Sequence, residues 1–441
     1  MELKTRVFLG FWSLIWNLFL PAILLYLRKR ARKDALYGEH LNERFGRYRV
    51  PMQGAVWVHA VSLGELRSAV PLIKALLAQG EKVVVTQFTP AGRRETERVF
   101  AQAIAAGQLQ SVWVPLETKW AYRGFFHSFQ PKYGLVMEIE IWPRMAVAAK
   151  RASVPLFMCN AQYPSKSIEK DKRSFGLRPA VMRQFAGAFV KSDLQAARFA
   201  AVGVKNIHIT GELRFDQPIP EHLTKAGLFV REKLGAIDRP VITYASTVEG
   251  EDSVYIETMH KLQAQFSTPP LFVYVPRRPE RFDEIYDMLQ SEGFAVLRRS
   301  STLPDDLSTE PDQWELPSGP PDILLGDSLG EMYFYLALAD KAVVGGGFVP
   351  AGAHNIIEPL ALKKPVMTGP QTWTIEYPFE EAKAAGVAAA AADARELCDS
   401  LAGTFAPDAA SINQFFTAHA GGTEKLLSAL PAALEAAHSK H

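Results

Sequence analysis

Residues 55–89 read AVWVHAVSLGELRSAVPLIKALLAQGEKVVVTQFT, and this stretch decides the fold. Two short apolar runs, 55–62 and 82–89, flank a segment in which leucine, valine and isoleucine recur at helical spacing. Continuous apolar runs of this length are typical of strands that are buried on both faces of a parallel sheet. The stretch therefore predicts a strand, a helix and a second strand of one parallel sheet.

The same alternation continues along the chain and falls into two groups. The further strands predicted for the first group are 111–115, 133–140, 154–160, 187–192 and 207–211. After a pause, the strands predicted for the second group are 241–246, 271–276, 295–299, 322–326, 341–346, 364–369 and 386–392. Two groups of this kind predict two doubly wound, Rossmann-like α/β domains that face a cleft.

The pattern also predicts where the domains begin and end. We expect a membrane anchor at 1–33, an N-terminal domain at 34–216, a linker at 217–238, a C-terminal domain at 239–415 and a helical tail at 416–441. Proline, aspartate and serine are frequent between residues 304 and 321, which is typical of a surface loop.

The N-terminus differs from the rest of the chain. Residues 7–27 contain no charge, and about 20 apolar residues suffice to cross a bilayer as a helix. The basic residues of 28–33 place the remainder of the chain on the cytoplasmic side. Asn17 and Pro21 leave open whether the segment spans the membrane or lies in its interface. A cleaved signal peptide is disfavoured, because no small-residue cleavage site precedes the basic residues.

The composition narrows the classes of function. The chain has 441 residues, of which 48% are hydrophobic and 22% charged, with a net charge of +2. A nucleic-acid-binding protein usually needs a dense basic face, so this class is disfavoured. The two cysteines, Cys159 and Cys398, do not form a disulfide framework, and we expect them to be buried apolar groups in a reducing compartment.

A first candidate site follows the first predicted strand. Ser62 and Gly64 suit a tight turn that lets a ligand approach the backbone, and Glu65 falls in the first turn of the next helix. The helix dipole favours an ionised carboxylate there, which can act as a general base. The alternative is an ordinary glutamate that stabilises its own helix.

A second candidate site is the segment YGLVMEIEIWPRM at 133–145. Glu138 and Glu140 lie two residues apart, so on a strand both side chains point to one face. Two neighbouring carboxylates repel each other unless the strand end opens to solvent or to a polar ligand. The segment therefore predicts a polar acceptor pocket, and the alternative is a structural network with Arg144.

A third set of residues follows three strands of the second group. Arg277 comes directly after the strand 271–276, where a guanidinium can bind a phosphate with two hydrogen bonds. The segment 326–331 and the glycines 345–347 allow close backbone approach, and glycine N–H groups can cradle an anion. Each element alone is compatible with a plain turn. Together, at the strand ends of one domain, they predict a nucleotide site.

A further part of this set opens the helix after the glycines. His354 and Asn355 lie at its start, and Glu358 lies one turn later on a similar face. We expect the Glu358 carboxylate to accept hydrogen bonds from a ribose.

Taken together, these motifs resemble those of the Kdo (3-deoxy-D-manno-octulosonic acid) transferases of lipopolysaccharide assembly, which have the GT-B architecture. The matching segments are HAVSLGE (59–65), FTPAG (88–92), MEIEIWP (137–143), NAQ (160–162), TGELRFD (210–216), ASTVEGE (245–251), VPRRPERF (275–282), GDSLGE (326–331) and GAHNIIEP (352–359). They occur in order over nearly the whole chain.

The resemblance implies an inverting transfer of Kdo from CMP-Kdo to a lipid A precursor, lipid IVA, at the bacterial inner membrane, without metal or cofactor. It implies Glu65 as the general base. The acceptor-side residues that it implies are Ser62, Gly64, Glu138 and Glu140. The donor-binding residues are Arg277, Ser328, Leu329, Gly330, Gly346, Gly347, His354, Asn355 and Glu358. The implied partners are CMP-Kdo, the lipid A precursor and inner-membrane lipids.

The sequence departs from the family pattern at several positions, among them Ile139, Gln162, Val248 and Ala353. Gln162 and Val248 replace an arginine and a histidine, which removes two polar donors. Two alternatives therefore stay open. The chain is a divergent GT-B enzyme that uses another nucleotide sugar, or it is a catalytically weak paralogue that binds lipid A.

Overall fold

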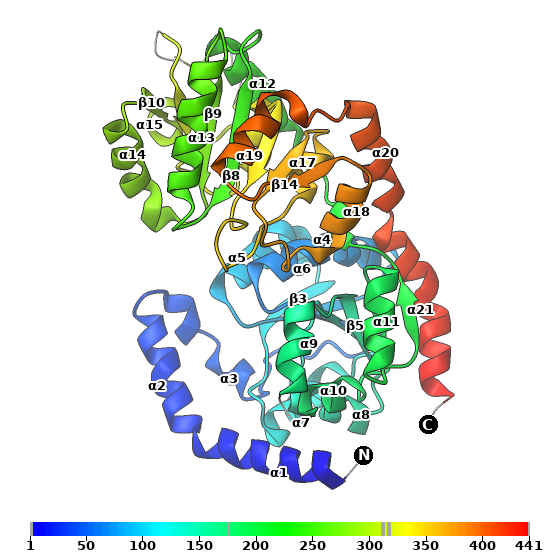
Figure 1. The fold of residues 1–441 in the computed structure, drawn as a ribbon. Coiled ribbons are helices and arrows are strands. Elements are labelled where there is room, and N and C mark those ends of the chain that lie inside the picture. Colours follow the sequence, from blue (N-terminus) through cyan, green and yellow to red (C-terminus); the bar gives the residue numbers. More distant parts are fainter. Residues whose placement is uncertain (1–2, 174–175, 310–313, 315–318, 440–441) are drawn as a thin grey trace. The chain divides into compact units, whose positions relative to one another are not determined.

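The structure is a computed structural model, and it describes residues 3–173, 176–309, 314 and 319–439. The chain divides into two compact units, unit 1 with Met1–Gln217 and Ala420–His441, and unit 2 with Pro218–His419. Each unit contains one seven-stranded sheet in which all paired strands are parallel, with helices on both faces (Figure 1). The two predicted Rossmann-like α/β domains are confirmed.

Unit 1 is built on a sheet with the strand order β3-β2-β1-β4-β5-β6-β7. Its strands are β1 (Val56–His59), β2 (Val83–Gln87), β3 (Leu109–Trp113), β4 (Gly134–Met137), β5 (Leu156–Ala161), β6 (Gly187–Val190) and β7 (Ile207–Ile209). Every residue of β1, β2, β4, β5 and β6 is buried, which explains their nearly continuous apolar sequences. Cys159 lies in β5 and is buried, as expected.

The helices of unit 1 lie before, between and after its strands. They are α1 (Leu3–Leu18), α2 (Leu20–Ala31), α3 (Leu41–Arg44), α4 (Leu63–Ala78), α5 (Pro90–Val99), α6 (Ala101–Ala105), α7 (Lys119–Phe129), α8 (Pro143–Arg151), α9 (Ser165–Lys172), α10 (Leu177–Met182), α11 (Asp193–Ala201) and α21 (Gly422–His438). Four of them begin directly after Ser62, Thr89, Thr118 or Ser192, whose side chains accept a backbone N–H of the first turn. Such caps satisfy donors that a helix start leaves unpaired.

Unit 2 has the strand order β10-β11-β9-β8-β12-β13-β14. Its strands are β8 (Val241–Thr247), β9 (Leu271–Pro276), β10 (Val296–Arg298), β11 (Ile323–Leu325), β12 (Lys341–Val344), β13 (Val366–Thr368) and β14 (Ala388–Ala390). Its helices are α12 (Glu221–Lys233), α13 (Asp252–Gln265), α14 (Phe282–Ser291), α15 (Arg299–Thr302), α16 (Met332–Leu338), α17 (Ile357–Ala361), α18 (Glu376–Ala384), α19 (Ala394–Asp399) and α20 (Ala409–His419). Of the loop predicted at 304–321, residues 310–313 and 315–318 lie outside the described residues.

Two segments outside the predicted domains are structured parts of the units. The predicted linker 217–238 contains α12, whose Leu223 and Val230 are buried in the core of unit 2. The predicted tail contains α21, which packs on unit 1 through Leu426 and Leu430. Asp216 fixes the start of α21, since its carboxylate accepts backbone N–H groups at 2.7 and 2.6 Å. Apolar side chains on one face of each helix explain why these segments pack rather than extend.

The N-terminal apolar run forms two helices instead of one. α1 ends at Leu18 and α2 begins at Leu20, with Pro21 in its first turn. Pro21 has no N–H to continue the hydrogen bonding of α1, which explains the break. Within the described residues, no single helix has the length and apolar composition needed to cross a membrane. Residues 10–18 and α2 have the required length and apolar composition only when they are taken together, and the two helices are bent by 54° relative to each other.

Candidate active site

Glu65 lies in the first turn of α4, at the carboxyl end of β1, where the sequence predicts it. Its carboxylate accepts hydrogen bonds from the backbone N–H of Val61 at 2.8 Å and from the hydroxyl of Ser62 at 2.9 Å. The Ser62 hydroxyl in turn accepts the N–H of Glu65 at 3.3 Å, which closes a reciprocal cap. These bonds fix the orientation of the carboxylate. Gly64 is exposed, and its missing side chain leaves open space beside the turn.

The environment of Glu65 prepares it to exchange a proton near neutral pH. Partial burial, followed by the nearby charge of Glu140, raises the pKa of Glu65 to about 7, against the lowering effect of its two hydrogen bonds. Glu138 adds a smaller effect in the same direction. A general base works best when its pKa lies near the working pH. Two of the carboxylates that the sequence singled out in unit 1, Glu138 and Glu140, therefore act electrostatically on the third, Glu65.

The strand predicted at 133–140 is shorter than expected. β4 ends at Met137, and Glu138 adopts a positive φ of 56° in the turn that follows. Glu138 and Glu140 therefore belong to a loop at the strand end, and their shared face on a strand was a wrong prediction. The backbone leaves the sheet after the N–H of Glu138 donates to the carbonyl of Cys159 at 2.7 Å. The loop is closed by Glu140, which accepts the indole N–H of Trp142 at 2.6 Å.

Cations that sequence reasoning missed surround Glu138. Arg214 donates to its carboxylate at 2.8 Å, and Lys191 lies 3.8 Å away. Lys191 is almost fully buried and also pairs with the buried Glu212 at 2.6 Å. Both cations follow strands of the predicted sheet, β6 and β7, and Arg214 belongs to the TGELRFD motif. Their place at the strand ends was the available signal.

Two of the positions at which the sequence departs from the family pattern, Gln162 and Ile139, lie at or beside this loop. The side-chain amide of Gln162 donates to Glu138 at 3.5 Å, a long hydrogen bond from a position where the family has arginine. Glu138 is bound directly by Arg214. The backbone N–H of Arg144, the residue of the alternative network, donates to the buried carboxylate of Glu117 at 2.8 Å. Ile139 packs against the apolar core of unit 1.

Unit 2 places Arg277 and His354 side by side. Arg277 follows β9, its side chain is exposed, and its guanidinium hydrogen-bonds to Nδ1 of His354. The backbone N–H of His354 donates to the carbonyl of Gly345 at 3.0 Å, which ties the histidine to the glycine loop. Burial, and then the charge of Arg277, lowers the pKa of His354 to about 4. The imidazole is therefore neutral at pH 7, and Arg277 supplies the positive charge.

The glycine loop after β12 is organised by a glutamate that the site prediction did not include. Both carboxylate oxygens of Glu251 accept the N–H of Gly346, at 2.9 and 2.8 Å, and one accepts the N–H of Val248 at 3.0 Å. Glu251 is fully buried. The N–H of Gly346 is thus taken by Glu251, because a buried carboxylate needs donors, and the anion cradle formed by the glycine amides stays a prediction. Gly347 lies against the backbone of Gly369, where any side chain would clash.

The remaining predicted donor residues lie on two loops of unit 2. The side-chain oxygen of Asn355 accepts the N–H of Ile357 at 3.0 Å and so begins α17, and Glu358 lies in the first turn of this helix. The hydroxyl of Ser328 contacts the carboxylate of Glu331 and lies 2.6 Å from the hydroxyl of Tyr335.

Ala353 and the 328–330 loop also belong to the segments of unit 2 where the sequence predicts donor binding. Leu329 is 67% exposed, and Gly330 has a φ of 85°, so this loop projects outward. Ala353 is buried, and its N–H donates to the carbonyl of Gln371 at 2.8 Å. Across the described part of the chain, no three His, Cys, Asp or Glu side chains are grouped so that they could hold a metal ion.

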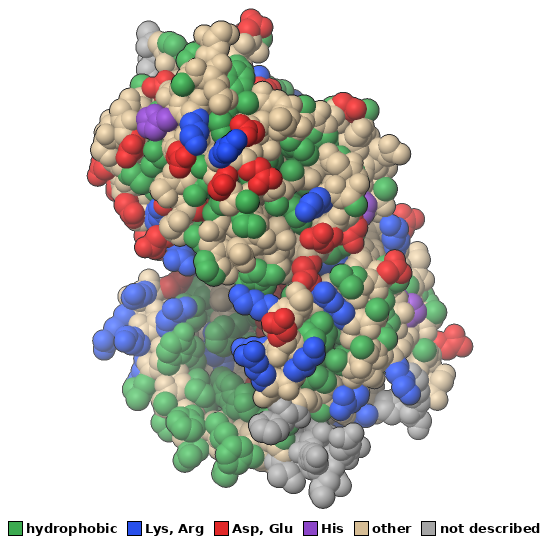
Figure 2. Space-filling model, viewed as in Figure 1, with side chains coloured by type: hydrophobic (Ala, Val, Ile, Leu, Met, Phe, Trp, Pro, Cys, Tyr) green, Lys and Arg blue, Asp and Glu red, His purple; other side chains and the backbone are tan. Residues whose placement is uncertain are grey.

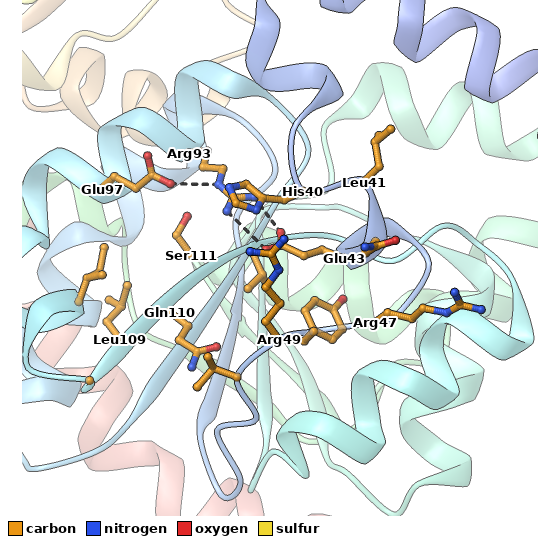
Figure 3. Close-up of a pocket in the computed structure, with 16 residues that line it drawn as sticks. His40, Leu41, Glu43, Arg47, Arg49, Arg93, Glu97, Leu109, Gln110 and Ser111 are labelled. Carbon is orange, nitrogen blue, oxygen red and sulfur yellow. Dashed lines mark hydrogen bonds and ion pairs between the residues drawn. The ribbon is translucent and has the colours of Figure 1, made fainter.

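A cavity of about 590 Å³ lies elsewhere on unit 1, along the edge strand β3 (Figure 3). Arg93 crosses its wall and pairs with Glu43 at 2.8 Å and with Glu97 at 3.0 Å. Glu43 also accepts the backbone N–H of Trp113 at 2.8 Å, which covers part of the open edge of β3. The predicted site residues are not among those that line this cavity.

Comparisons with known proteins agree with the arrangement of motifs. Residues 39–217 match the family model described as 3-Deoxy-D-manno-octulosonic-acid transferase (kdotransferase). The chain is 39% identical to a 3-deoxy-D-manno-octulosonic acid transferase of Bordetella pertussis, over 96% of this chain and 98% of that protein. It is 30% identical to the protein of the same name from Haemophilus influenzae, over 81% of each chain.

The fold has relatives among solved structures. A glycosyltransferase from Rickettsia africae superimposes with a TM-score of 0.56, over 88% of this chain and 99% of that one, at 13% sequence identity. At this identity the likeness concerns the fold alone. It places the two α/β units among GT-B-like structures.

Proposed function

This chain belongs to the 3-deoxy-D-manno-octulosonic acid (Kdo) transferase family of glycosyltransferases, and on this premise we propose its reaction in detail. It transfers Kdo from CMP-Kdo to a lipid A precursor, lipid IVA, with inversion at the anomeric carbon. The observation that supports this most directly is Glu65, a carboxylate with a pKa of about 7 beside the acceptor-side loop of unit 1.

In the proposed step, Glu65 accepts the proton of the attacking hydroxyl of the acceptor. The hydroxyl oxygen forms a bond to the anomeric carbon of Kdo from the face opposite the phosphate, and the bond from that carbon to the phosphate oxygen breaks. CMP leaves with the electron pair. Arg214 and Lys191 neutralise Glu138 and leave Glu140 as the main charge acting on Glu65. A carboxylate whose proton affinity is raised in this way is a stronger base.

The donor side of the proposal lies in unit 2. Arg277 provides a guanidinium for the phosphate of CMP, and Asn355 and Glu358 at the start of α17 are suited to the nucleoside. The exposed loop of Ser328, Leu329 and Gly330 lines the same proposed site. Gly347 contributes its backbone to this proposed site, and Glu251 holds Gly346 in place.

Departure of CMP requires stabilisation of its negative charge. A guanidinium and backbone N–H groups supply this without a metal ion. We therefore propose that the reaction needs neither metal nor cofactor. The corresponding measurement is turnover after exhaustive treatment with a chelator, with and without added Mg²⁺.

We further propose that α1 and α2 hold the enzyme on the cytoplasmic face of the inner membrane. Their exposed side chains include Phe11, Leu14, Leu18 and Leu25, with exposed fractions of 61, 63, 71 and 65%. Figure 2 shows hydrophobic side chains gathered over these helices, with lysine and arginine at the end of α2. Apolar faces bordered by basic residues bind anionic bilayers. Flotation with anionic vesicles tests this, and Leu14→Glu with Leu18→Glu should reduce it.

The reaction itself is tested with purified protein in detergent, lipid IVA, and CMP-Kdo generated in place. We expect the mass of the lipid to increase by one or more Kdo units. Turnover with a different nucleotide sugar alone would favour the divergent-enzyme alternative. Absence of turnover, with a related enzyme active in parallel, would favour the weak paralogue.

A further inference from the structure

A second cavity of unit 1, of about 410 Å³, lies between α1 and the loop that follows β4. Its volume falls within the range of about 300–1,000 Å³ that is usual for ligand pockets. Its walls are mainly aromatic and aliphatic. The side chains that matter for the argument are Trp12, Trp16, Ile141, Trp142, Leu177 and Val181.

One buried carboxylate, that of Glu117, lies in the wall of this cavity and accepts hydrogen bonds from the protein itself. Glu117 accepts the indole N–H of Trp12 at 3.0 Å and the backbone N–H groups of Arg144 and Met145 at 2.8 and 3.0 Å. Burial raises the pKa of Glu117. Because three protein donors already bind both oxygens of this carboxylate, it offers a ligand in the cavity little polar surface. The same bonds join its two walls, α1 on one side and the start of α8 on the other.

The cavity shares a loop with the acceptor-side carboxylates. Ile141 and Trp142 line it and directly follow Glu140 in the chain. The Trp142 ring that contributes to the wall also donates its N–H to Glu140 at 2.6 Å. A ligand in the cavity therefore contacts the residues that position Glu140, which acts in turn on Glu65.

The other wall belongs to the helix that faces lipid in the proposed function. On α1, Trp12 and Trp16 turn toward the cavity, whereas Phe11, Leu14 and Leu18 are exposed. One helix thus presents one face to the apolar surroundings and the other to the cavity. Besides Glu117, the charged side chains that line the cavity are Asp171 and Arg178, which lie 3.8 Å apart.

We infer that this cavity binds one fatty acyl chain of the lipid acceptor and so places the acceptor sugar at the loop of Glu138 and Glu140. The inference rests on the proposed function and specifies its acceptor subsite. A flexible apolar chain fits a largely apolar cavity beside a lipid-facing helix, and a sugar or nucleotide does not. Each methylene group buried there should tighten binding by about threefold to fourfold.

The first test compares acceptors whose acyl chains differ in length, with the full-length protein in detergent and CMP-Kdo in excess. Removing two methylene groups from each chain should raise KM about tenfold and change kcat little, because binding in the ground state and in the transition state is lost equally. Turnover with a KM independent of chain length overturns the acyl-chain inference and leaves the proposed transfer intact. Absence of turnover with every acceptor contradicts the proposed function instead.

The second test fills the cavity. Leu177→Trp should raise KM for the long-chain acceptor to that for the short-chain acceptor. Leu228→Trp, at an exposed leucine on α12 of unit 2, is the matched control and should keep the chain-length dependence. Equal loss of turnover with both acceptors in a folded Leu177→Trp protein contradicts the inference. If that variant does not fold, Trp16→Ala opens the cavity and should likewise weaken the dependence on chain length.

A third measurement distinguishes the acceptor from bulk phospholipid. Acceptor with brominated acyl chains should quench the tryptophan fluorescence of the wild type in detergent, and quench it less in Trp16→Ala. Non-brominated phospholipid in excess should not reverse this quenching. Full reversal would assign the cavity to membrane phospholipid and overturn the acceptor assignment.

Discussion

Glu65 of unit 1 and Glu251 of unit 2 occupy corresponding positions in their sheets, but the groups that surround them differ. Each follows the first strand of its sheet, β1 or β8, and stands at the start of the next helix. Each accepts a backbone N–H from the turn before it, from Val61 or from Val248. Burial is the first cause that raises the pKa of both carboxyl groups.

The difference lies in what else surrounds each carboxylate. Glu251 is fully buried and also takes the N–H of Gly346, so it holds the glycine loop and has no contact with solvent. Glu65 keeps a partly exposed carboxylate, and its charged neighbours are Glu140 and Glu138. The surroundings of Glu65, which include other carboxylates, suit the base that we propose, whereas the backbone N–H groups around Glu251 indicate a structural role.

The largest expected effect is on the base. Glu65→Gln should lower kcat by about 100-fold to 10,000-fold, because general base catalysis contributes about that much. The measurement is Kdo transfer to lipid IVA by mass spectrometry, and a melting curve establishes that the variant is folded. Turnover within a few-fold of the wild type would show that Glu65 is not the general base, and the proposed difference in role between Glu65 and Glu251 would then be lost.

The next effect concerns the charge on the donor side. Arg277→Ala should raise KM for CMP-Kdo about tenfold to hundredfold, since a hydrogen bond to a charged group contributes about 1.5–3 kcal/mol. Arg277→Lys should recover part of this affinity, because lysine keeps the charge and loses the paired hydrogen bonds. Arg278, the neighbouring arginine, provides the control substitution to alanine. Equal effects at both positions would show that Arg277 has no special role.

The structural role assigned to Glu251 makes a prediction about stability. Glu251→Ala leaves the N–H groups of Gly346 and Val248 without their acceptor, at a cost of about 1–3 kcal/mol in the free energy of unfolding. Glu251→Gln keeps one acceptor oxygen and should lose less. Urea unfolding measures both. If Glu251→Gln retained full stability and abolished turnover, Glu251 would have a role in the reaction, which contradicts the structural role assigned to it.

The smallest effect is a shift of the pH profile. Activity should fall as the pH decreases through about 7, because Glu65 becomes protonated and can no longer accept a proton. Glu140→Gln removes the charge that, after burial, does most to raise the pKa of Glu65, so the acidic limb of kcat should move to lower pH by up to about one unit. Glu138→Gln should move it less. An unchanged limb in Glu140→Gln would mean that burial alone sets this pKa.

Most of the fold could be predicted because the apolar pattern is strong. All fourteen predicted strands overlap strands of the structure, since buried parallel strands have nearly continuous apolar sequences. The errors occur where a local signal competes with tertiary packing. The strand through Glu138 was extended too far, because nothing in MEIE reveals the positive φ at this residue. The length of the apolar run at 7–27 predicted one helix, whereas the structure has two, with Pro21 in the first turn of the second.

The candidate site was predictable in part for a related reason. Glu65, Arg277 and Asn355 lie at strand ends or helix starts, which follow from the order of elements alone. Lys191 and Arg214 were missed because their partner, Glu138, is distant in sequence. Glu251 was quoted in a motif, but its contact with Gly346 could not be foreseen from spacing.

The sequence by itself determined the two α/β units, the order of their strands along the chain and the residues at the strand ends, because hydrophobic periodicity and turn residues are local properties. Only the tertiary structure decided which carboxylates pair with cations. Hydrogen bonds and charges act over a few ångströms in space, so the pKa of Glu65 depends on Glu140, and Glu138 pairs with Arg214, whatever their separation along the chain.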